Sequence, residues 1–330
     1  MNRRLLFIVA ALCPAFAQNG VIPYAIGYTQ PSAFRAAPGE VATLFLYGIP
    51  FGENGRNRSA QADAGMLPTN LAGISVRVFQ GNSPGIPAGI FAVQQIEQCG
   101  LSGVVTGDQS CLLTMVKLQF PFEFTGDPVL QPDGTVTFQL PALISIDVDG
   151  HLGRLFPLQP LPDDSHILTT CDASWDTNPS SVCDRQVYHS DGSVVTQDKP
   201  ANVGETLFLL FYGLGRTDPA VPTGTPSPAG VAATDPIQDH PRVTLGIEPN
   251  FLNAVSSSPR AIVNTRKAYA MPVTITSRSL QSGQIGVYQV SFTVPAPSLP
   301  LLPCGNGVRS NSLLYATTSQ GVESMALCIQ

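Results

Sequence analysis

Short apolar segments separated by glycine and proline are the feature of this sequence that most restricts its fold. The segments are rich in Val, Ile, Thr, Phe and Tyr, and no helical period runs through them: Val41–Ile49, Ile74–Phe79, Leu112–Phe120, Thr135–Leu140, Leu207–Tyr212, Arg242–Ile247, Ile285–Val294 and Ser312–Thr318. Such runs between turn-forming residues predict β-strands. Several connections carry dipeptides suited to the positive φ of tight hairpin turns: Asp133-Gly134, Asp149-Gly150, Asp191-Gly192 and Asn306-Gly307. The pattern predicts an all-β chain.

An internal repeat predicts two β-sandwiches. The segment Ala37–Ile49 aligns with Asn202–Leu214, and both read as a turn, Gly-Glu, an apolar strand and Tyr-Gly. Because a repeated segment of this kind marks one structural unit, we expect two tandem immunoglobulin-like β-sandwich domains at residues 18–160 and 161–330. Prolines within Phe156–Asp164 predict a stiff connection between them.

The N-terminus reads as a cleavable secretion signal over residues 1–17. Arg3-Arg4 precede the apolar run Leu5–Leu12, and Ala15-Phe16-Ala17 forms a small-x-small cleavage site. The run is too short for a transmembrane helix, which takes about 20 apolar residues, and no later segment is long and apolar enough. We therefore expect secretion, or an extracytoplasmic position at the cell envelope.

Cysteines predict the covalent bracing of the exported chain. Removal of the signal discards Cys13 and leaves an even number of cysteines, which implies disulfides in an oxidising compartment. Pairing of sequence neighbours is the simplest of the possible maps: Cys99–Cys111, Cys171–Cys183 and Cys304–Cys328. No C-x-x-C or paired His/Cys spacing is present, which disfavours a metal centre built from these residues.

The charge balance limits the classes of partner. Charged residues make up 12% of the chain and the formal net charge is −6. Without a cluster of Lys and Arg, the sequence argues against nucleic acid or an anionic membrane as partner. It also lacks a P-loop, a dinucleotide fingerprint and an H-E-x-x-H motif, so we expect no cofactor.

A set of short motifs occurs in a fixed order along the chain: Ala37–Glu40, Leu67–Val76, Pro200–Glu205, Tyr212–Gly215, Pro222–Gly224, Gly286–Val290 and Ser310–Ser312. In this order the chain resembles the exported acidobacterial proteins that carry the Solibacter-type C-terminal domain. The resemblance covers nearly the whole mature chain, although the long cysteine-bearing insertions depart from the pattern. It implies export and an immunoglobulin-like β fold. It implies no catalytic residue, because the family has no assigned activity.

Two features could indicate catalysis. Residues 81–85 match G-x-S-x-G, but this motif works on a strand-to-helix turn, and Pro84 and Pro87 predict a loop between strands instead. The histidines are scattered and show no recognised spacing to a Ser, Cys or acid: His151, His166, His189 and His240. A secreted hydrolase that uses one of them remains an alternative, since a catalytic set can assemble in space.

Alternating oxygen side chains resemble the start of a calcium-binding loop: Asp172, Ser174, Asp176 and Asn178. However, Thr177 stands where such a loop needs Gly, and Cys183 stands where it needs a bidentate Glu. A disulfide-closed loop is therefore the preferred interpretation, and calcium is the alternative.

The single tryptophan, Trp175, lies in the same loop and could stack on a ligand together with Tyr188. Asp172 and Asp176 complete this set of candidate binding residues. We expect a non-catalytic protein for adhesion, recognition or structure, whose partner is an unknown protein or glycan at the cell surface. The alternatives are a carbohydrate-binding accessory module and the secreted hydrolase.

Overall fold

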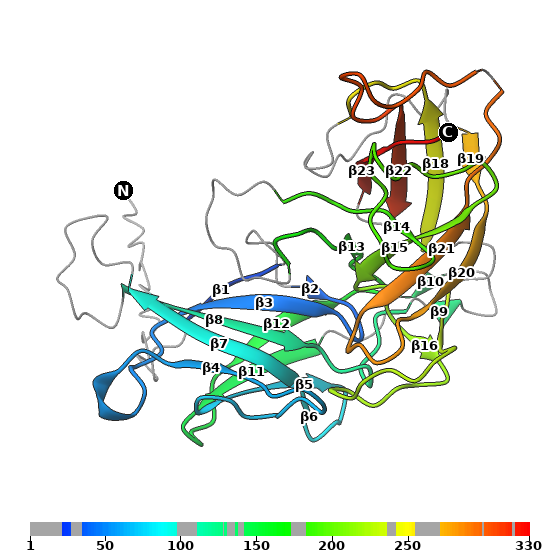
Figure 1. Cartoon of the computed structure of the whole chain (residues 1–330). Coiled ribbons are helices and arrows are strands. Elements are labelled where there is room, and N and C mark those ends of the chain that lie inside the picture. The colour runs from blue at the N-terminus through cyan, green and yellow to red at the C-terminus, as the bar shows by residue number, and fades with distance from the viewer. Residues whose placement is uncertain are drawn as a thin grey trace, which may run out of the picture.

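The protein is an all-β structure, as the strand pattern predicted. The computed structural model describes residues 22–27, 35–97, 111–127, 129–130, 136–137, 142–172, 183–235, 242–254, 271–298, 300–318 and 321–330. Within these ranges the chain consists of strands and turns, and one 3-10 turn spans Glu53–Gly55. Figure 1 shows the strands of the N-terminal and C-terminal parts as two groups that meet at an angle. The predicted signal, residues 1–17, lies outside the described residues.

The first half of the chain, β1 to β12, forms two five-stranded sheets and a two-stranded ribbon. One sheet has the order β1-β3-β8-β7-β4, from Ile22–Gly27, Val41–Tyr47, Leu112–Gln119, Gly89–Glu97 and Ser59–Gln61. The other has the order β2-β12-β11-β5-β6, from Arg35–Ala36, Leu155–Pro160, Ala142–Val148, Ile74–Gln80 and Ile86–Pro87. The ribbon pairs β9 (Val129–Leu130) with β10 (Val136–Thr137).

The second half, β13 to β23, also forms two sheets. The larger has the order β13-β15-β21-β20-β17-β16, with β14 also beside β15, from His166–Ile167, Thr206–Tyr212, Tyr288–Thr293, Ile275–Leu280, Ala232–Ala233, Thr217–Asp218 and Tyr188–His189. The smaller has the order β19-β18-β22-β23, from Met271–Val273, Val243–Pro249, Ser312–Thr318 and Gly321–Leu327.

The strand order of the first half recurs in the second. The row β3-β8-β7 corresponds to β15-β21-β20, and the row β12-β11-β5-β6 corresponds to β23-β22-β18-β19. Corresponding strands also follow one another in the same order along the chain. In each half a residue before the first long strand pairs in parallel with a residue at or just after the end of the last strand, Ala36 with Pro160 and Ala201 with Ile329.

The turn before β3 and the turn before β15 explain why Gly-Glu recurs in the sequence. In the first turn, the Glu40 carboxylate accepts a hydrogen bond from Ala37 N at 2.7 Å, and Gly39 has φ +71°. In the second, the Glu205 carboxylate accepts one from Asn202 N at 2.8 Å, and Gly204 has φ +83°. Glycine adopts positive φ at little cost, and the glutamate satisfies a backbone donor outside the sheet.

Each half has its own hydrophobic core, to which both of its sheets contribute. Alternation along β5 buries Ile74, Val76 and Val78 and exposes Arg77. These residues pack with Leu44 of β3 in the first core. The second core contains the corresponding side chains of β15 and β18, including Leu209 and Leu245. The period-two pattern of burial is the one expected for a sheet with a single buried face.

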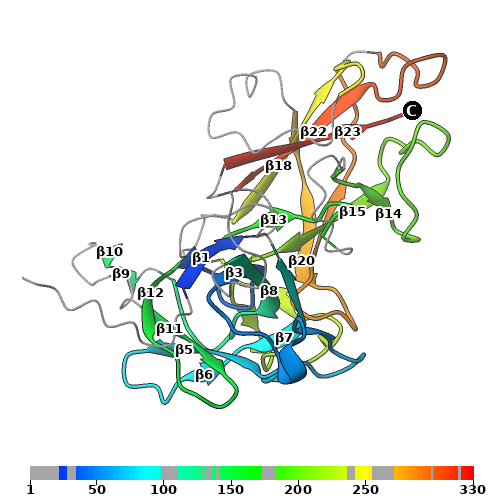
Figure 2. The same ribbon diagram turned by 90° about the vertical axis from the view of Figure 1, so that its left-hand side faces the viewer.

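A third cluster and several hydrogen bonds join the halves, which lie against one another in both views (Figures 1 and 2). Val41 of β3 packs with Tyr212 and Val287 of the second half. The loop before β17 reaches back to the first half, where Gly224 N donates to Gln119 Oε1 at 2.7 Å. A Cβ at Gly286 would lie 2.6 Å from Val41 Cγ2, so only glycine permits this approach.

The connection between the halves is shorter than Phe156–Asp164, the range that the prolines predicted. Residues 155–160 form strand β12, and only residues 161–165 link it to β13. Pro157 is tolerated because β2 pairs only with Gln159 and Pro160, which leaves the start of β12 at the sheet edge. Leu161 N donates to Ala36 O at 2.9 Å, and Asp164 N donates to Gly213 O at 3.0 Å. The connection is thus hydrogen-bonded to both halves.

Candidate functional site

A groove of about 550 Å³ lies at the end of the second half that carries the C-terminus. Three chain segments line it: residues 197–203 before β15, residues 297–304 after β21, and residues 329–330 after β23. All three leave the sheets at the same end of the second half, because β21 and β23 end there and β15 begins there.

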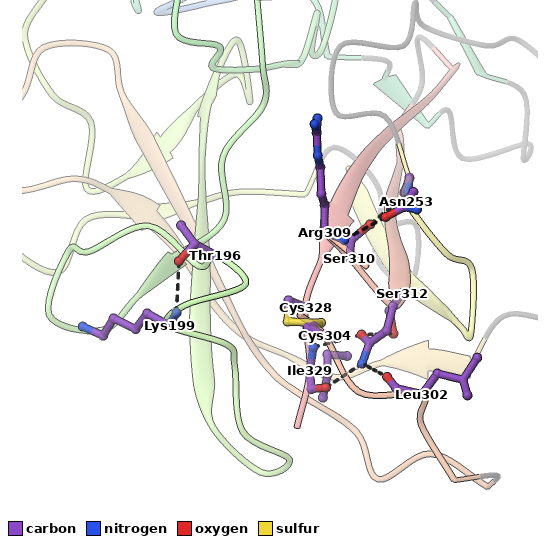
Figure 3. Close-up of a disulfide and its surroundings, with 12 residues drawn as sticks. Thr196, Lys199, Asn253, Leu302, Cys304, Arg309, Ser310, Ser312, Cys328 and Ile329 are labelled. Atoms are coloured by element: carbon purple, nitrogen blue, oxygen red, sulfur yellow. Dashed lines mark hydrogen bonds between the residues drawn. A yellow bond between two sulfur atoms is a disulfide. The ribbon is translucent and has the colours of Figure 1, made fainter. Parts of the chain in front are cut away.

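The segment after β21 is anchored at two points close to the groove. A disulfide joins Cys304 to Cys328, next to β23 (Figure 3). Asn311, which is fully buried, donates from Nδ2 to the carbonyl oxygens of Leu302 and Ile329, both at 2.7 Å. Its Oδ1 accepts from Ile329 N at 3.0 Å. One buried amide therefore ties two walls of the groove together.

Asn250, in the turn after β18, holds the same segment from its other side. Its Oδ1 accepts a hydrogen bond from Leu302 N at 2.9 Å, and its Nδ2 donates to Pro300 O at 3.1 Å. Leu302 therefore has its backbone N–H and its carbonyl both fixed by side-chain amides. Prolines 297, 300 and 303 further limit the conformations of the segment.

Apolar side chains stand exposed on this fixed backbone. Leu302 is 49% exposed and Val203, on the opposite wall, is 43% exposed. The partly buried Leu301 adds further apolar surface and Asp198 adds a carboxylate, whereas Ile329 lines the groove but is only 3% exposed. Exposed apolar groups held in a rigid hollow are typical of interaction sites, because little conformational entropy is lost when a partner binds.

Removing the Cys304–Cys328 disulfide tests how the groove is held. Replacing both cysteines with Ala is expected to lower the free energy of unfolding by roughly 3 to 4 kcal/mol, because the bridge closes a loop with a sequence separation of 24. Denaturant unfolding measures this loss. Amide hydrogen exchange should accelerate at Leu302 and Ile329 while amides of β3 stay protected; unchanged protection at Leu302 would contradict the assigned role.

The cysteine pairs of the described residues are Cys171–Cys183 and Cys304–Cys328, two of the three pairs that sequential pairing predicted. Cys111 is buried at the start of β8. Cys99 lies outside the described residues, so the pair Cys99–Cys111 stays a prediction.

Asp172 faces the protein interior rather than a solvent loop. It is buried, and its Oδ2 accepts hydrogen bonds from Thr169 N at 2.5 Å and Thr169 Oγ1 at 2.8 Å. His166 Nε2 lies 2.9 Å from the same oxygen. Burial alone raises the pKa of Asp172, but the nearby His166 and the hydrogen bonds from Thr169 outweigh it and lower the pKa.

The other predicted calcium and ligand-binding residues of this loop lie outside the described residues: Ser174, Trp175, Asp176 and Asn178. The calcium site therefore stays a prediction. Among the described residues, no group of three or more His, Cys, Asp or Glu side chains is arranged to hold a metal ion.

Lys117 connects this buried cluster to the first half. From β8 it donates to the backbone oxygen of Asp172 at 2.5 Å, and its Nζ lies 5.9 Å from the centre of the Tyr212 ring. Burial lowers the pKa of Lys117 and raises that of Tyr212. These groups contact one another across the junction and do not line the groove, which indicates a structural role for the cluster.

The geometry around the histidines gives little support to a hydrolase. His166 lies between Asp172 and Glu323, but all three are buried and none lines the groove. His189 Nδ1 lies 2.5 Å from Glu205 Oε1, beside the turn before β15. His151 is in an exposed turn, and His240 lies outside the described residues.

Ser83, the central residue of the G-x-S-x-G match, lies in the turn between β5 and β6. Its N–H donates to Gln80 O at 3.2 Å, and its Oγ accepts from Gln80 N at 3.3 Å. This is a connection between two strands, so the strand-to-helix geometry of a nucleophile elbow is not formed here.

Tyr188 uses one face of its ring within the protein. The ring stacks on Phe208 of β15, with centroids 5.2 Å apart and planes at 13°. Its hydroxyl donates to Gln186 Oε1 at 2.9 Å. Because Trp175 lies outside the described residues, a joint surface of these two aromatic residues stays a prediction.

The groove residues Leu302 and Val203, and Asn311 that anchors the segment of Leu302, were not among the candidates that the sequence analysis named. A signal for Leu302 exists in the sequence, where leucines and prolines make up residues 299–303 between Ser298 and Cys304. Apolar residues in a proline-rich connection have no strand in which to be buried. The importance of Asn311, by contrast, depends on two carbonyls brought together by the fold.

Comparisons with known proteins give distant structural similarity. No family model matches the sequence, and no curated protein matches it. Among solved structures, the adhesin InvE of Yersinia pseudotuberculosis matches over 91% of this chain and 57% of that chain, at 14% identity and a TM-score of 0.19. The match thus spans a little over half of that adhesin chain. A similarity at this TM-score decides neither fold nor function. None of the described helical segments could cross a membrane.

Proposed function

We propose that this chain is a non-catalytic, exported protein of two tandem immunoglobulin-like β-sandwich domains, residues 18–160 and 161–330, which acts in adhesion, recognition or structure. The strand rows support the fold. The rows β1-β3-β8-β7 and β12-β11-β5 correspond to the A-B-E-D and G-F-C sheets of an immunoglobulin domain, and the second half repeats both rows. Similarity to the Solibacter-type family stays part of this proposal.

The groove beside Cys304–Cys328 carries the proposed function. The connection after β21 exposes the side chains of Leu302 and Pro303 to solvent. An exposed connection does not need a fixed backbone for packing. Nevertheless, a disulfide, Asn250 and the fully buried Asn311 fix its backbone. Such bracing of an exposed apolar surface serves binding, since it lowers the entropy lost when a partner docks.

The chemistry of the groove favours a protein partner over a glycan. Sugars stack on aromatic rings, yet the described groove lining consists of aliphatic, proline, cystine and polar side chains, Leu301 and Leu302 among them. Apolar anchors of this type fit the buried core of a protein interface. The carbohydrate-binding alternative still has Tyr188, whose ring has one face stacked on Phe208.

Exported location is part of the proposal and has two supports. The first is the predicted signal at residues 1–17. The second is the presence of two disulfides, Cys171–Cys183 and Cys304–Cys328, which persist in oxidising compartments.

Binding of the mature chain to protein and glycan arrays tests the proposal. Leu302→Asp should weaken capture of protein partners at least roughly tenfold, because it places a charge in the apolar contact. Leu155→Asp is the matched control, since Leu155 is similarly exposed, at 46%, but lies on the first half. Equal binding by wild type and Leu302→Asp, or binding to glycans alone, would overturn the groove as the interaction site.

A further inference from the structure

The groove lies at one end of the second half. The corresponding end of the first half is the one against which the second half packs. In the first half, Leu161 N donates to Ala36 O at 2.9 Å, and the chain then continues into the second half. In the second half, Gln330 N donates to Ala201 O at 2.8 Å. Ala201 comes directly before the turn 202–205, just as Ala36 comes directly before the turn 37–40. The turns 37–40 and 202–205 also have the same hydrogen bonds.

The two equivalent ends differ in whether they are covered. Val41, just after the first turn, is 1% exposed because Val287 and Tyr212 of the second half pack on it. Thr206 at the same position of the second half is exposed, and so is Val203 in the preceding turn, at 43%. The end of the first half is thus covered by the loop end of another β-domain. We infer that the equivalent end of the second half can bind a loop end of the same kind.

The matching loop end of the first half carries an exposed leucine. Leu152, 76% exposed, lies in the turn between β11 and β12. Because β12 ends at the connection to the second half, its beginning lies at the far end of the first half. Figures 1 and 2 show the β11–β12 end and the C-terminus on opposite sides of the molecule.

The turn that carries Leu152 is held as firmly as the groove. Asp149 and Gly150 adopt positive φ, +52° and +79°. The Asp149 carboxylate accepts two hydrogen bonds from the buried Arg58, at 2.9 and 2.6 Å. Gly153 N donates to Asp147 Oδ1 at 2.9 Å. A rigid turn thus presents a single large apolar side chain to solvent.

We propose that this chain associates head to tail with a second copy of itself, with the Leu152 turn of one copy seated in the groove of the next. This rests on the proposed function, in which the groove is a protein interface. Leu152 meets Leu302 and Val203 in the groove, and the cationic Arg154 beside the turn faces Asp198 at the rim. Because the two contact surfaces differ, the interface is heterologous and repeats along a line of copies unless the rotation closes a ring.

Sedimentation velocity of the mature chain over a concentration series tests the proposal, with two single variants and a mixture. The wild type is expected to form species larger than a dimer as concentration rises. Leu302→Asp lacks a working groove and Leu152→Asp lacks a working turn, so each alone should be monomeric. Mixed in equal amounts they retain one intact interface, and a dimer that does not extend should form. Leu143→Asp is the control that associates like the wild type, because Leu143 is 37% exposed but lies at the start of β11, at the opposite end of that strand from the turn.

A wild type that stays monomeric at every concentration overturns the proposal, as does a Leu152→Asp variant that still associates. Circular dichroism melting of each variant shows that it is folded, so that loss of association is not loss of structure. A monomeric wild type that still captures other proteins through Leu302 would reject self-association and keep the proposed function. Unaltered partner capture by Leu302→Asp would instead reject the proposed function.

Discussion

Replacing Arg242 with Met is expected to lower the free energy of unfolding by about 3 to 5 kcal/mol, as for other buried charges that lose their partner. The Arg242 side chain is 1% exposed and donates to the carbonyl oxygens of Pro162 and Thr234. It also pairs with Asp127 of the first half at 3.1 Å. Asp163, in the connection, lies 3.9 Å away and is buried.

The physical reason for so large an effect is that one guanidinium serves three parts of the chain. Methionine would leave the carbonyls of Pro162 and Thr234 without this donor and take a counter-ion from Asp127 and Asp163. Burying polar groups without their partners has a high free-energy cost. Because the connection between the halves depends on this residue, small-angle X-ray scattering should also show a more extended molecule.

Denaturant unfolding followed by circular dichroism measures the loss, and Arg278→Met is the matched control. Arg278 pairs with Asp235, but its side chain is 23% exposed, so its removal should cost less than about 1 kcal/mol. If both variants lost the same free energy of unfolding, the burial of Arg242 at the junction could not be the cause of its contribution.

The second large effect is expected at Gly39, for which the chain provides its own control. An added Cβ at Gly39 would lie 2.0 Å from Phe122 Cε1, and Phe122 is itself buried in the core of the second half. At Gly204, in the equivalent turn, nothing lies within 4 Å of the added atom. Both glycines have positive φ, +71° and +83°.

Gly204→Ala should therefore report the backbone strain alone, which is about 1 to 2 kcal/mol for a left-handed residue. Gly39→Ala should add roughly 1 to 3 kcal/mol for overpacking against Phe122. The difference between the two midpoints of denaturant unfolding isolates the packing contribution, since the turns share their hydrogen bonds. Similar losses for both variants would mean that the Phe122 ring moves aside freely.

Much of the fold could be predicted from local patterns. Predicted strands at Val41–Ile49, Ile74–Phe79 and Ser312–Thr318 match β3, β5 and β22 within two residues at each end. The predicted segment Ile285–Val294 begins too early, because Gly286 adopts φ +67° in the turn that packs on Val41. Strand β21 then starts at Tyr288.

The sequence analysis did not predict two strands that contain few large apolar residues. β23, Gly321–Leu327, alternates small and polar residues with Met325 and Leu327, and β7, Gly89–Glu97, contains two adjacent glutamines. β23 pairs with β22 in a hairpin, whereas the buried Gln95 of β7 depends on a residue far along the chain, because its side chain donates to Ile49 O at 2.9 Å. No local composition rule reports such a partner.

The candidate site could be predicted least. The sequence analysis placed binding residues at Asp172, Asp176, Trp175 and Tyr188, of which the described ones make contacts inside the protein. Asp172 has the composition of a loop ligand, but its carboxylate is taken by Thr169 and His166. A pattern of alternating acidic residues does not show whether their side chains face solvent or the protein interior.

The sequence by itself determined the turns, the strand alternation and the repeat, because each depends on the φ preference of a residue or on its near neighbours. For this reason Gly39 and Gly204 occupy the same position in two equivalent turns. Only the tertiary structure decided that Val41 is covered while Leu302 and Leu152 are exposed. Exposure depends on which distant segments arrive to pack on a side chain, and those contacts exist only once both halves have folded and docked.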